Sequence, residues 1–206
     1  MKIIDLTQDI HSGMPVYPGD PPVRITQVAD LKRDGYTVFK MQLNDQIGTH
    51  VETQYHMIAG RMLVHEGLDR CIGRARVVDV PCGRISASAL AHRGGARRCK
   101  MLLLRSGYSE AKHGINVDDD ERPVLDMDAI KWIVKSGITL MGIDCFDFDQ
   151  PPDYLGHKYL LKHNIIIVEG LTNLSLLTRK TVKLFVIPLR IRGVGASPCR
   201  AFAIEE

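Results

Sequence analysis

The sequence predicts an α/β fold with a mixed sheet, and two observations lead to that prediction. From residue 75 onward, apolar runs of strand length alternate with stretches whose apolar residues recur at helical spacing, which is the pattern of strands joined by helices. Before residue 75 the strand-length runs follow one another directly, which favours antiparallel or mixed pairing. A chain of 206 residues suits one domain, over residues 1–206, that can bury its own core.

Composition narrows the class of protein. Apolar residues make up 45% of the chain and charged residues 25%, as in soluble globular proteins. The net charge of +3 gives no reason to expect a nucleic-acid or membrane partner. The five cysteines form no C-x-x-C pair, which favours reduced thiols over a disulfide framework or a cysteine zinc site. With no recognisable signal peptide or membrane-length apolar run, these features predict a cytoplasmic protein.

The opening third reads as strands. Residues 2–6, 23–28 and 39–43 are predicted strands, and Asp34-Gly35 is the predicted hairpin turn between the last two. Residues 14–22 contain four prolines, which exclude regular structure there. We expect this segment either to wall a pocket or simply to cross the surface.

The rest of the chain alternates between strands and helices. The predicted strands are aliphatic runs at residues 75–80, 101–105, 138–143, 164–168, 184–189 and 201–204. The predicted helices are residues 86–92 with Ser86 as N-cap, residues 127–134 between the cap Asp126 and the terminator Gly137, and residues 157–162. Two charged segments, residues 93–100 and 107–122, are predicted as exposed loops.

Residues 46–56 carry the candidate site. In an extended chain, alternate residues face opposite sides. One face would then hold the polar set Gln46, Gly48, His50, Glu52, Gln54 and His56, and the other the packing set Ile47, Thr49, Val51, Thr53 and Tyr55. The polar set can converge only if the chain bends, and Gly48 is the expected hinge. Taken alone, the segment fits either a metal and proton-transfer site or a half-buried strand whose histidines are merely hydrogen-bonded.

Two later residues extend the candidate site. His157 begins a predicted helix, and Glu169 directly follows a predicted strand. The end of a strand is where α/β sheets commonly place functional side chains. Considered singly, each residue is equally well explained as a surface histidine and as a glutamate that begins a turn.

With these residues identified, the chain resembles the cyclase family that includes bacterial kynurenine formamidases and isatin hydrolases. The family signature is similar to H-x-G-T-H-x-D-x-P-x-H, and residues 46–56 follow it with Gln46, Glu52 and Gln54 in place of the first histidine, the aspartate and the proline. Similar segments lie along nearly the whole chain, at residues 4–7, 13–20, 142–144, 157, 167–174, 188–190 and 195–201. The resemblance implies a swivelling β/β/α single domain and a homo-oligomer.

The resemblance also implies roles for individual residues. His50 and Glu52 correspond to metal ligands, His157 and Glu169 to the distal ligand pair, and His56 to the catalytic acid–base residue. Gln46 stands at a ligand position, where its amide oxygen is a weaker donor to Zn²⁺ than imidazole. We therefore expect a divalent metal, Zn²⁺ or Mn²⁺, with one or two ions per chain.

The implied function is hydrolysis of a small amide or lactone, in which a C–N or C–O bond is opened as in kynurenine formamidase. The metal would polarise the carbonyl and lower the pKa of its bound water for the attack, and His56 would transfer the proton. Two alternatives stay open at this point: a metal-dependent lyase or cyclase, and a metal-poor family member that does not catalyse a reaction. The substrate is expected to be a small molecule, which the sequence does not name.

Overall fold

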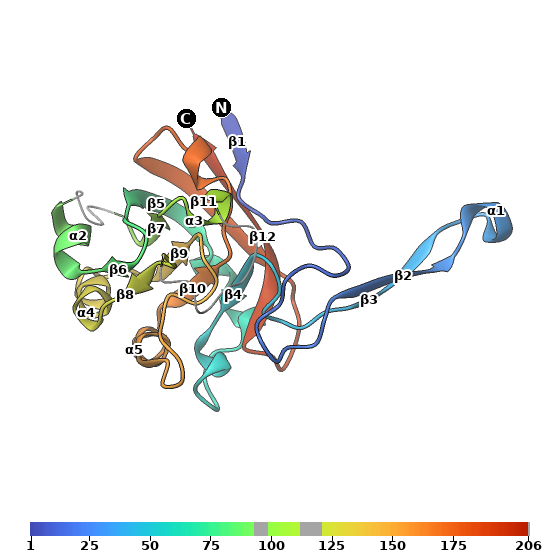
Figure 1. Cartoon of the computed structure of the whole chain (residues 1–206), viewed down its shortest axis with the longest axis horizontal. Helices are drawn as coiled ribbons and strands as arrows, with labels where there is room; N and C mark the ends of the chain where they lie inside the picture. Colours follow the sequence, from blue (N-terminus) through green and yellow to red (C-terminus); the bar gives the residue numbers. More distant parts are fainter. Residues whose placement is uncertain (93–98, 112–120, 206) are drawn as a thin grey trace.

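The computed structural model describes residues 1–92, 99–111 and 121–205. Its main sheet contains, in spatial order, β1 (Lys2–Asp5), β12 (Ala196–Glu205), β11 (Thr181–Pro188), β5 (Ile72–Asp79), β7 (Met101–Arg105), β9 (Leu140–Ile143), β10 (Ile166–Glu169) and β4 (His50–Glu52). β12 also pairs with β4, so that seven of these strands close into a barrel (Figure 1). The pairs β5–β7, β7–β9 and β9–β10 are parallel and the others are antiparallel, which confirms the predicted mixed sheet.

The parallel strands are covered on both faces. Met101 and Leu103 of β7 face the apolar core inside the barrel, whereas Leu102 and Leu104 face a second core outside it. Three helices pack over this second core: α2 (Ala87–His92), α4 (Met127–Lys135) and α5 (Leu155–Lys162). Figure 1 shows these helices gathered on one side of the barrel. Burial on both faces explains why these strands are continuous aliphatic runs in the sequence.

The helix ends follow the predictions in part. The hydroxyl of Ser86 accepts a hydrogen bond from the backbone N–H of Ala89 at 3.4 Å, as an N-cap does. Gly137 follows α4 in the left-handed region, with φ of 71°. Asp126 precedes α4 as predicted, but its carboxylate does not cap the helix and pairs with Arg84 instead.

Several predictions need correction. Asp34-Gly35 is not a tight hairpin turn, because residues 31–34 form the short helix α1 (Leu31–Asp34), which ends at Gly35. β12 begins five residues before the predicted start because its first residues pair with β4. Residues 107–122 are not simply an exposed loop, since α3 (Tyr108–Ala111) begins there and both Tyr108 and Arg122 are buried. Residues 93–98 and 112–120, most of the two predicted loops, lie outside the described residues.

Short elements that the sequence did not indicate complete the fold. β6 (Arg84–Ile85) and β8 (Val124–Leu125) form a small parallel sheet. Four 3₁₀ helices are described: η1 (Gln54–His56), η2 (Val64–Glu66), η3 (Leu68–Arg70) and η4 (Leu174–Leu176). Among the described residues, no helix is both long and apolar enough to span a membrane.

A two-stranded sheet projects from the barrel. β2 (Arg24–Ala29) and β3 (Val38–Gln42) pair antiparallel with each other, and α1 forms the tip between them. Figure 1 shows this extension reaching well away from the rest of the chain.

Candidate metal site and pocket

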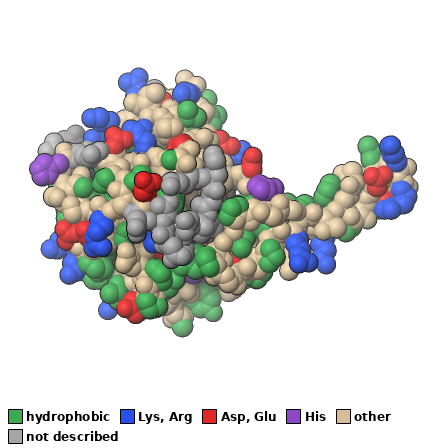
Figure 2. Space-filling model, in the orientation of Figure 1, with side chains coloured by type: hydrophobic (Ala, Val, Ile, Leu, Met, Phe, Trp, Pro, Cys, Tyr) green, Lys and Arg blue, Asp and Glu red, His purple; other side chains and the backbone are tan. Residues whose placement is uncertain are grey.

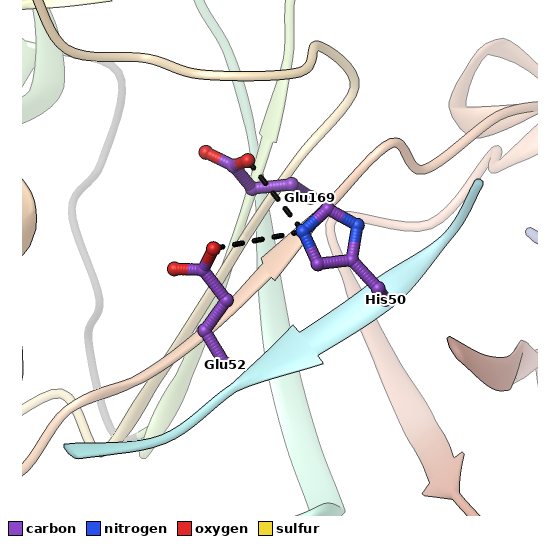
Figure 3. Close-up of side chains that lie close together, drawn as sticks. All are labelled: His50, Glu52 and Glu169. Carbon is purple, nitrogen blue, oxygen red and sulfur yellow. Dashed lines mark ion pairs between the residues drawn. The ribbon is translucent and has the colours of Figure 1, made fainter. Parts of the chain in front are cut away.

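Strand pairing brings the central ligands together. β4 lies between β10 and β12, and in its register with β10 His50 is opposite Glu169. His50, Glu52 and Glu169 are all buried, and their side chains point toward one another (Figure 3). Three potential ligand atoms, one from each residue, lie within 4.8 Å of one another. Residues about 120 positions apart in sequence thus form one cluster of a nitrogen and carboxylate oxygens.

The ring of His50 is held with one nitrogen free. Its Nδ1 lies 3.0 Å from the carbonyl oxygen of Gly48, so Nδ1–H donates there and Nε2 presents its lone pair to the cluster. Nε2 is 3.6 Å from Oε1 of Glu52 and 3.8 Å from Oε2 of Glu169, distances too long for good hydrogen bonds. Nε2 of His50 and Oε2 of Glu52 are buried without a hydrogen-bond partner, although buried polar atoms are normally satisfied. Such a set of unsatisfied nitrogen and carboxylate donors fits a divalent cation.

His157 is held in the same manner on the other side of the carboxylates. It lies in the first turn of α5, stacked on Phe148 with ring centroids 4.1 Å apart. Its Nδ1 is 3.3 Å from Oδ2 of Asp149, which also accepts the backbone N–H of His157 at 2.9 Å. Nε2 then points to Oε1 of Glu169, 3.2 Å away, and to Oε2 of Glu52, 3.8 Å away. A carboxylate behind a histidine is the usual partner that orients a metal-binding imidazole.

The charges of the cluster favour a cation. Burial raises the pKa of Glu52, but the neighbouring imidazoles of His56, His50 and His157 outweigh it and bring that pKa to about 2. Burial lowers the pKa values of His50 and His157, yet their carboxylate partners outweigh it and raise both. Buried carboxylates are stable only when a positive charge compensates them. Without an ion the imidazoles must supply that charge, whereas a bound cation would allow them to be neutral ligands.

Residues 46–56 do not form the single extended strand from which their two faces were predicted. Only His50–Glu52 is β-structure, and η1 turns the chain immediately afterwards. Gln54 leaves the polar face, because its amide donates to the carbonyl oxygen of Leu161 at 3.0 Å. The predicted packing set, Ile47, Thr49, Val51 and Thr53, is buried, but Tyr55 is exposed. Gly48 has a φ of 57°, a left-handed conformation that suits the predicted hinge.

The turn places His56 beside the cluster. Its Nε2 is 3.5 Å from Oε1 of Glu52, and its side chain is 27% exposed. Its Nδ1 is 3.1 Å from the side-chain amide nitrogen of Gln46. Gln46 therefore contacts His56, while the described three-residue cluster consists of His50, Glu52 and Glu169.

Two glycines allow the close approach of backbone to the site. A Cβ atom at Gly170, which follows Glu169, would lie 2.6 Å from the carbonyl oxygen of Gly48. A Cβ atom at Gly195 would lie 2.2 Å from the backbone nitrogen of His56. Any side chain at these positions would displace the segments that carry His50 and His56.

The cluster opens into a pocket of about 280 Å³. Besides the site residues, its walls include Tyr17, Asp20, Met57, Phe146, Asp147 and Tyr154. The hydroxyl of Tyr17 is 2.8 Å from that of Tyr154 and donates to Asp147 at 3.4 Å. The proline-rich segment, which supplies Tyr17 and Asp20, therefore walls a pocket, the first of its two expected roles. No lysine or arginine is found among the described residues that line the pocket.

Sequence reasoning missed the acidic residues that follow β9. Burial, together with the charge of Glu169, raises the pKa of Asp147 to about 6, and Asp149 orients His157. Their position just beyond the carboxyl end of a strand could have indicated that they belong to the site. The alternation Phe146-Asp147-Phe148-Asp149 gave no indication of which side chains would turn toward the pocket.

Comparison with known proteins shows which family and which folds this chain resembles. The family model described as "Putative cyclase" matches residues 4–150. An uncharacterized protein of Methanocaldococcus jannaschii is 30% identical over 99% of this chain and 100% of its own length. A kynurenine formamidase of Salinibacter ruber is 29% identical over 98% of this chain and 96% of its own. Isatin hydrolase A of Labrenzia aggregata superposes with a TM-score of 0.85 at 20% identity, covering 98% of this chain and 93% of that one.

These matches define the class as an enzyme with the cyclase fold, which confirms the predicted β/β/α architecture. The chain belongs to the cyclase family.

Proposed function

We propose that the chain is a metal-dependent hydrolase of small amides or lactones and that His50, Glu52, His157 and Glu169 hold the metal. The main support for this proposal is the position of two carboxylates between the imidazoles of His50 and His157. Glu52 and Glu169 each direct one oxygen toward Nε2 of His50 and the other toward Nε2 of His157. Such carboxylates can serve one shared ion or two neighbouring ones. The mixed nitrogen and oxygen donors suit Zn²⁺ or Mn²⁺.

The proposed reaction adds water across the scissile bond. A divalent ion bound here supplies Lewis acidity, which polarises a carbonyl and lowers the pKa of a coordinated water. The carbonyl carbon gains the water oxygen, the C–N or C–O bond breaks, and the leaving nitrogen or oxygen takes up a proton. His56 is suited to move that proton, because its Nε2 borders the cluster beside Glu52 while the ring stays partly open to the pocket. Gln46, at Nδ1, orients the ring.

The walls of the pocket indicate the substrate class. Tyr17, Phe146 and Tyr154 offer aromatic faces for a planar ring. Asp20 and Asp147 add carboxylates to those of the metal cluster, so the pocket favours a neutral or amine-bearing substrate over one with a remote carboxylate. An aryl formamide that has a free amine and no carboxylate fits these features.

Hydrolysis is tested with enzyme that is stripped by a chelator and then reloaded with Zn²⁺ or Mn²⁺. Formyl-anilides, isatin-like rings and small lactones are incubated with the enzyme in ¹⁸O-labelled water, and the masses of the products are measured by mass spectrometry. We expect activity only after reloading, with one labelled oxygen in the acid product. Turnover without label would instead indicate the lyase or cyclase alternative, and failure of every metal and substrate would contradict the proposal.

A further inference from the structure

A second cavity lies at the carboxyl ends of β5 and β7. Its volume is about 410 Å³, and it is bordered also by the last residue of α2 and by residues 178–180, which lead into β11. In Figure 1, β5, β7 and α2 lie on the side of the molecule opposite the projecting sheet. Among the described residues, this cavity and the metal-site pocket share no lining residue. The charged and titratable residues that line it are Arg76, Asp79, His92, Arg105, Arg179 and Lys180.

Strand pairing holds two of these cations in place. Arg76 of β5 is opposite Thr181, the first residue of β11. The pairing continues one residue further, because the backbone N–H of Val77 donates to the carbonyl oxygen of Lys180 at 3.0 Å. On the outer face of β5, Arg76 is followed by Val78, which is buried in the core under the helices. Arg76 therefore lies where the helical layer ends, on a hydrogen-bonded strand.

Positive charge is in excess in this cavity. Arg76, Arg105, Arg179 and Lys180 line it, and Asp79 is the one carboxylate among the described lining residues. Asp79 already pairs with Arg105, whose Nε lies 2.5 Å from Oδ1. Within the described chain, the other three cations have no carboxylate partner. Exposed arginines at three other places in the chain each pair with an aspartate.

Arg76 carries the clearest sign of a ligand site. Its Nε is buried without a hydrogen-bond partner, although buried N–H groups are normally satisfied. A guanidinium presents its donors in a planar fork that matches the oxygens of a phosphate. Nearby, Nδ1 of His92 lies 2.8 Å from the carbonyl oxygen of Ser88, so that Nδ1–H donates there and Nε2 is left for another contact.

A further carboxylate near the cavity has other partners. Glu205 accepts the backbone N–H groups of Thr178 and Arg179 at 2.7 and 2.8 Å, and the hydroxyl of Thr178 at 3.0 Å. Within the described chain it forms no ion pair with the side chain of Arg179 or Lys180. Glu205 thus fixes the segment before β11 while the two cations of that segment stay available.

We propose that this cavity binds a small organic phosphate, with Arg76, Arg179 and Lys180 around the phosphate group. A phosphate ester carries a charge of about −1.5 to −2 at neutral pH and three acceptor oxygens. Three unpaired cations suit this group better than a carboxylate, which has one charge and two oxygens. The volume of about 410 Å³ leaves room for an organic part beside the phosphate.

The distribution of charge argues against a nucleic acid as the ligand. The positive surface continues into a neighbouring hollow, where Arg74 and Lys183 lie. On the face that Figure 2 shows, however, Lys and Arg side chains are mixed with Asp and Glu and form no continuous track. The net charge of the whole chain is only +3. Nucleic-acid affinity comes from many phosphate contacts along such a track, so a compact anion suits the cavity better.

Isothermal titration calorimetry of the full metal-loaded chain with glycerol 3-phosphate tests the proposal. The test variant is Arg76→Gln with Lys180→Gln. The matched control is Lys135→Gln with Arg192→Gln, which removes the same charges at two exposed positions elsewhere. All titrations are made at one ionic strength, because salt screens such contacts.

We expect the wild type and the control to bind one glycerol 3-phosphate per chain with a Kd below about 1 mM. The test variant should raise that Kd about tenfold or more, because two charge-assisted contacts are lost. Acetate should bind the wild type at least about tenfold more weakly than glycerol 3-phosphate, because it offers less charge and fewer acceptors. Circular dichroism and metal content of the test variant should match those of the wild type.

Three results would overturn the proposal. A folded wild type that does not bind glycerol 3-phosphate would do so, including one that binds a single-stranded oligonucleotide. Equal Kd values for the test variant and the wild type would place the phosphate elsewhere, for example at the metal cluster. Acetate binding as tight as that of glycerol 3-phosphate would show that the cavity does not select phosphate. None of these readouts depends on the reaction proposed for the metal site.

Discussion

The carboxylate of Glu169 lies between the imidazoles of His50 and His157. Its Oε2 is 3.8 Å from Nε2 of His50, and its Oε1 is 3.2 Å from Nε2 of His157. Strand pairing sets the first contact, because Glu169 is opposite His50 in the β4–β10 register. The first turn of α5 sets the second. A change at Glu169 should therefore disturb both halves of the site, whereas a change at either histidine should disturb one.

His56 is predicted to serve turnover and not metal binding. His56→Ala should lower kcat by about 10²–10⁴-fold, the usual contribution of a general acid–base group. Bound metal should stay near the wild-type level, because the four proposed ligands are intact. His163→Ala, at an exposed histidine just after α5, is the matched control and should change neither quantity. Loss of metal in step with activity would instead show that His56 is a ligand.

Gln46 is predicted to position His56. Gln46→Leu keeps the size of the side chain but removes the amide that lies 3.1 Å from Nδ1 of His56. Loss of one such hydrogen bond should lower kcat about tenfold, with KM and metal content nearly unchanged. If metal content falls while kcat per bound ion is preserved, Gln46 is a metal ligand, as its place in the signature implies.

Gly195 is predicted to be required for the placement of His56. In Gly195→Ala the new methyl group would begin 2.2 Å from the backbone nitrogen of His56, so the turn η1 must move. We expect turnover to fall about 10–100-fold, with a loss of about 1–3 kcal/mol in the free energy of unfolding. Gly67→Ala is the control, since its φ of −105° suits alanine and its methyl group would make only ordinary contacts, the nearest at 3.5 Å. Equal loss of turnover in both variants would contradict a specific effect on His56.

Asp149 is predicted to tune metal affinity through His157. Asp149→Asn keeps the shape but removes the charge that lies 3.3 Å from Nδ1 of His157. Partners of this kind typically contribute about 10–100-fold to metal affinity, and competition with a chelating dye would measure the change. Asp153→Asn, at an exposed position in the same loop, should bind metal as the wild type does. An unchanged affinity in Asp149→Asn would mean that His157 is not a ligand.

The part of the site that the sequence could predict is the part set by strand pairing. His50, Glu52 and Glu169 lie in or at the ends of strands, and period-two alternation together with the strand-end rule locates such residues. The turn at Gln54–His56 could not be predicted this way, because hydrogen bonds to distant residues such as Leu161 and Gly195 determine it. Asp147 and Tyr154 have positive φ values that tertiary contacts impose.

The fold, like the site, has parts that the sequence predicts and parts that only tertiary contacts determine. The aliphatic runs of β7, β9 and β10 predicted buried strands, because burial on both faces leaves a direct mark on composition. The alternation of Phe39 and Met41 predicted a strand with one apolar face. It did not show that the described chain leaves this face exposed, since an alternating pattern indicates that a face is buried without indicating by what.

Elemental analysis tests whether His50, Glu52, His157 and Glu169 hold a divalent metal. Metal would be counted in wild-type protein purified without chelator, in His50→Ala and Glu169→Ala, and in the control His163→Ala, with circular dichroism confirming that each is folded. We expect one or two Zn²⁺ or Mn²⁺ ions per chain in the wild type and the control, with a sharp loss in the two site variants. Wild-type metal content in folded His50→Ala and Glu169→Ala would contradict this expectation.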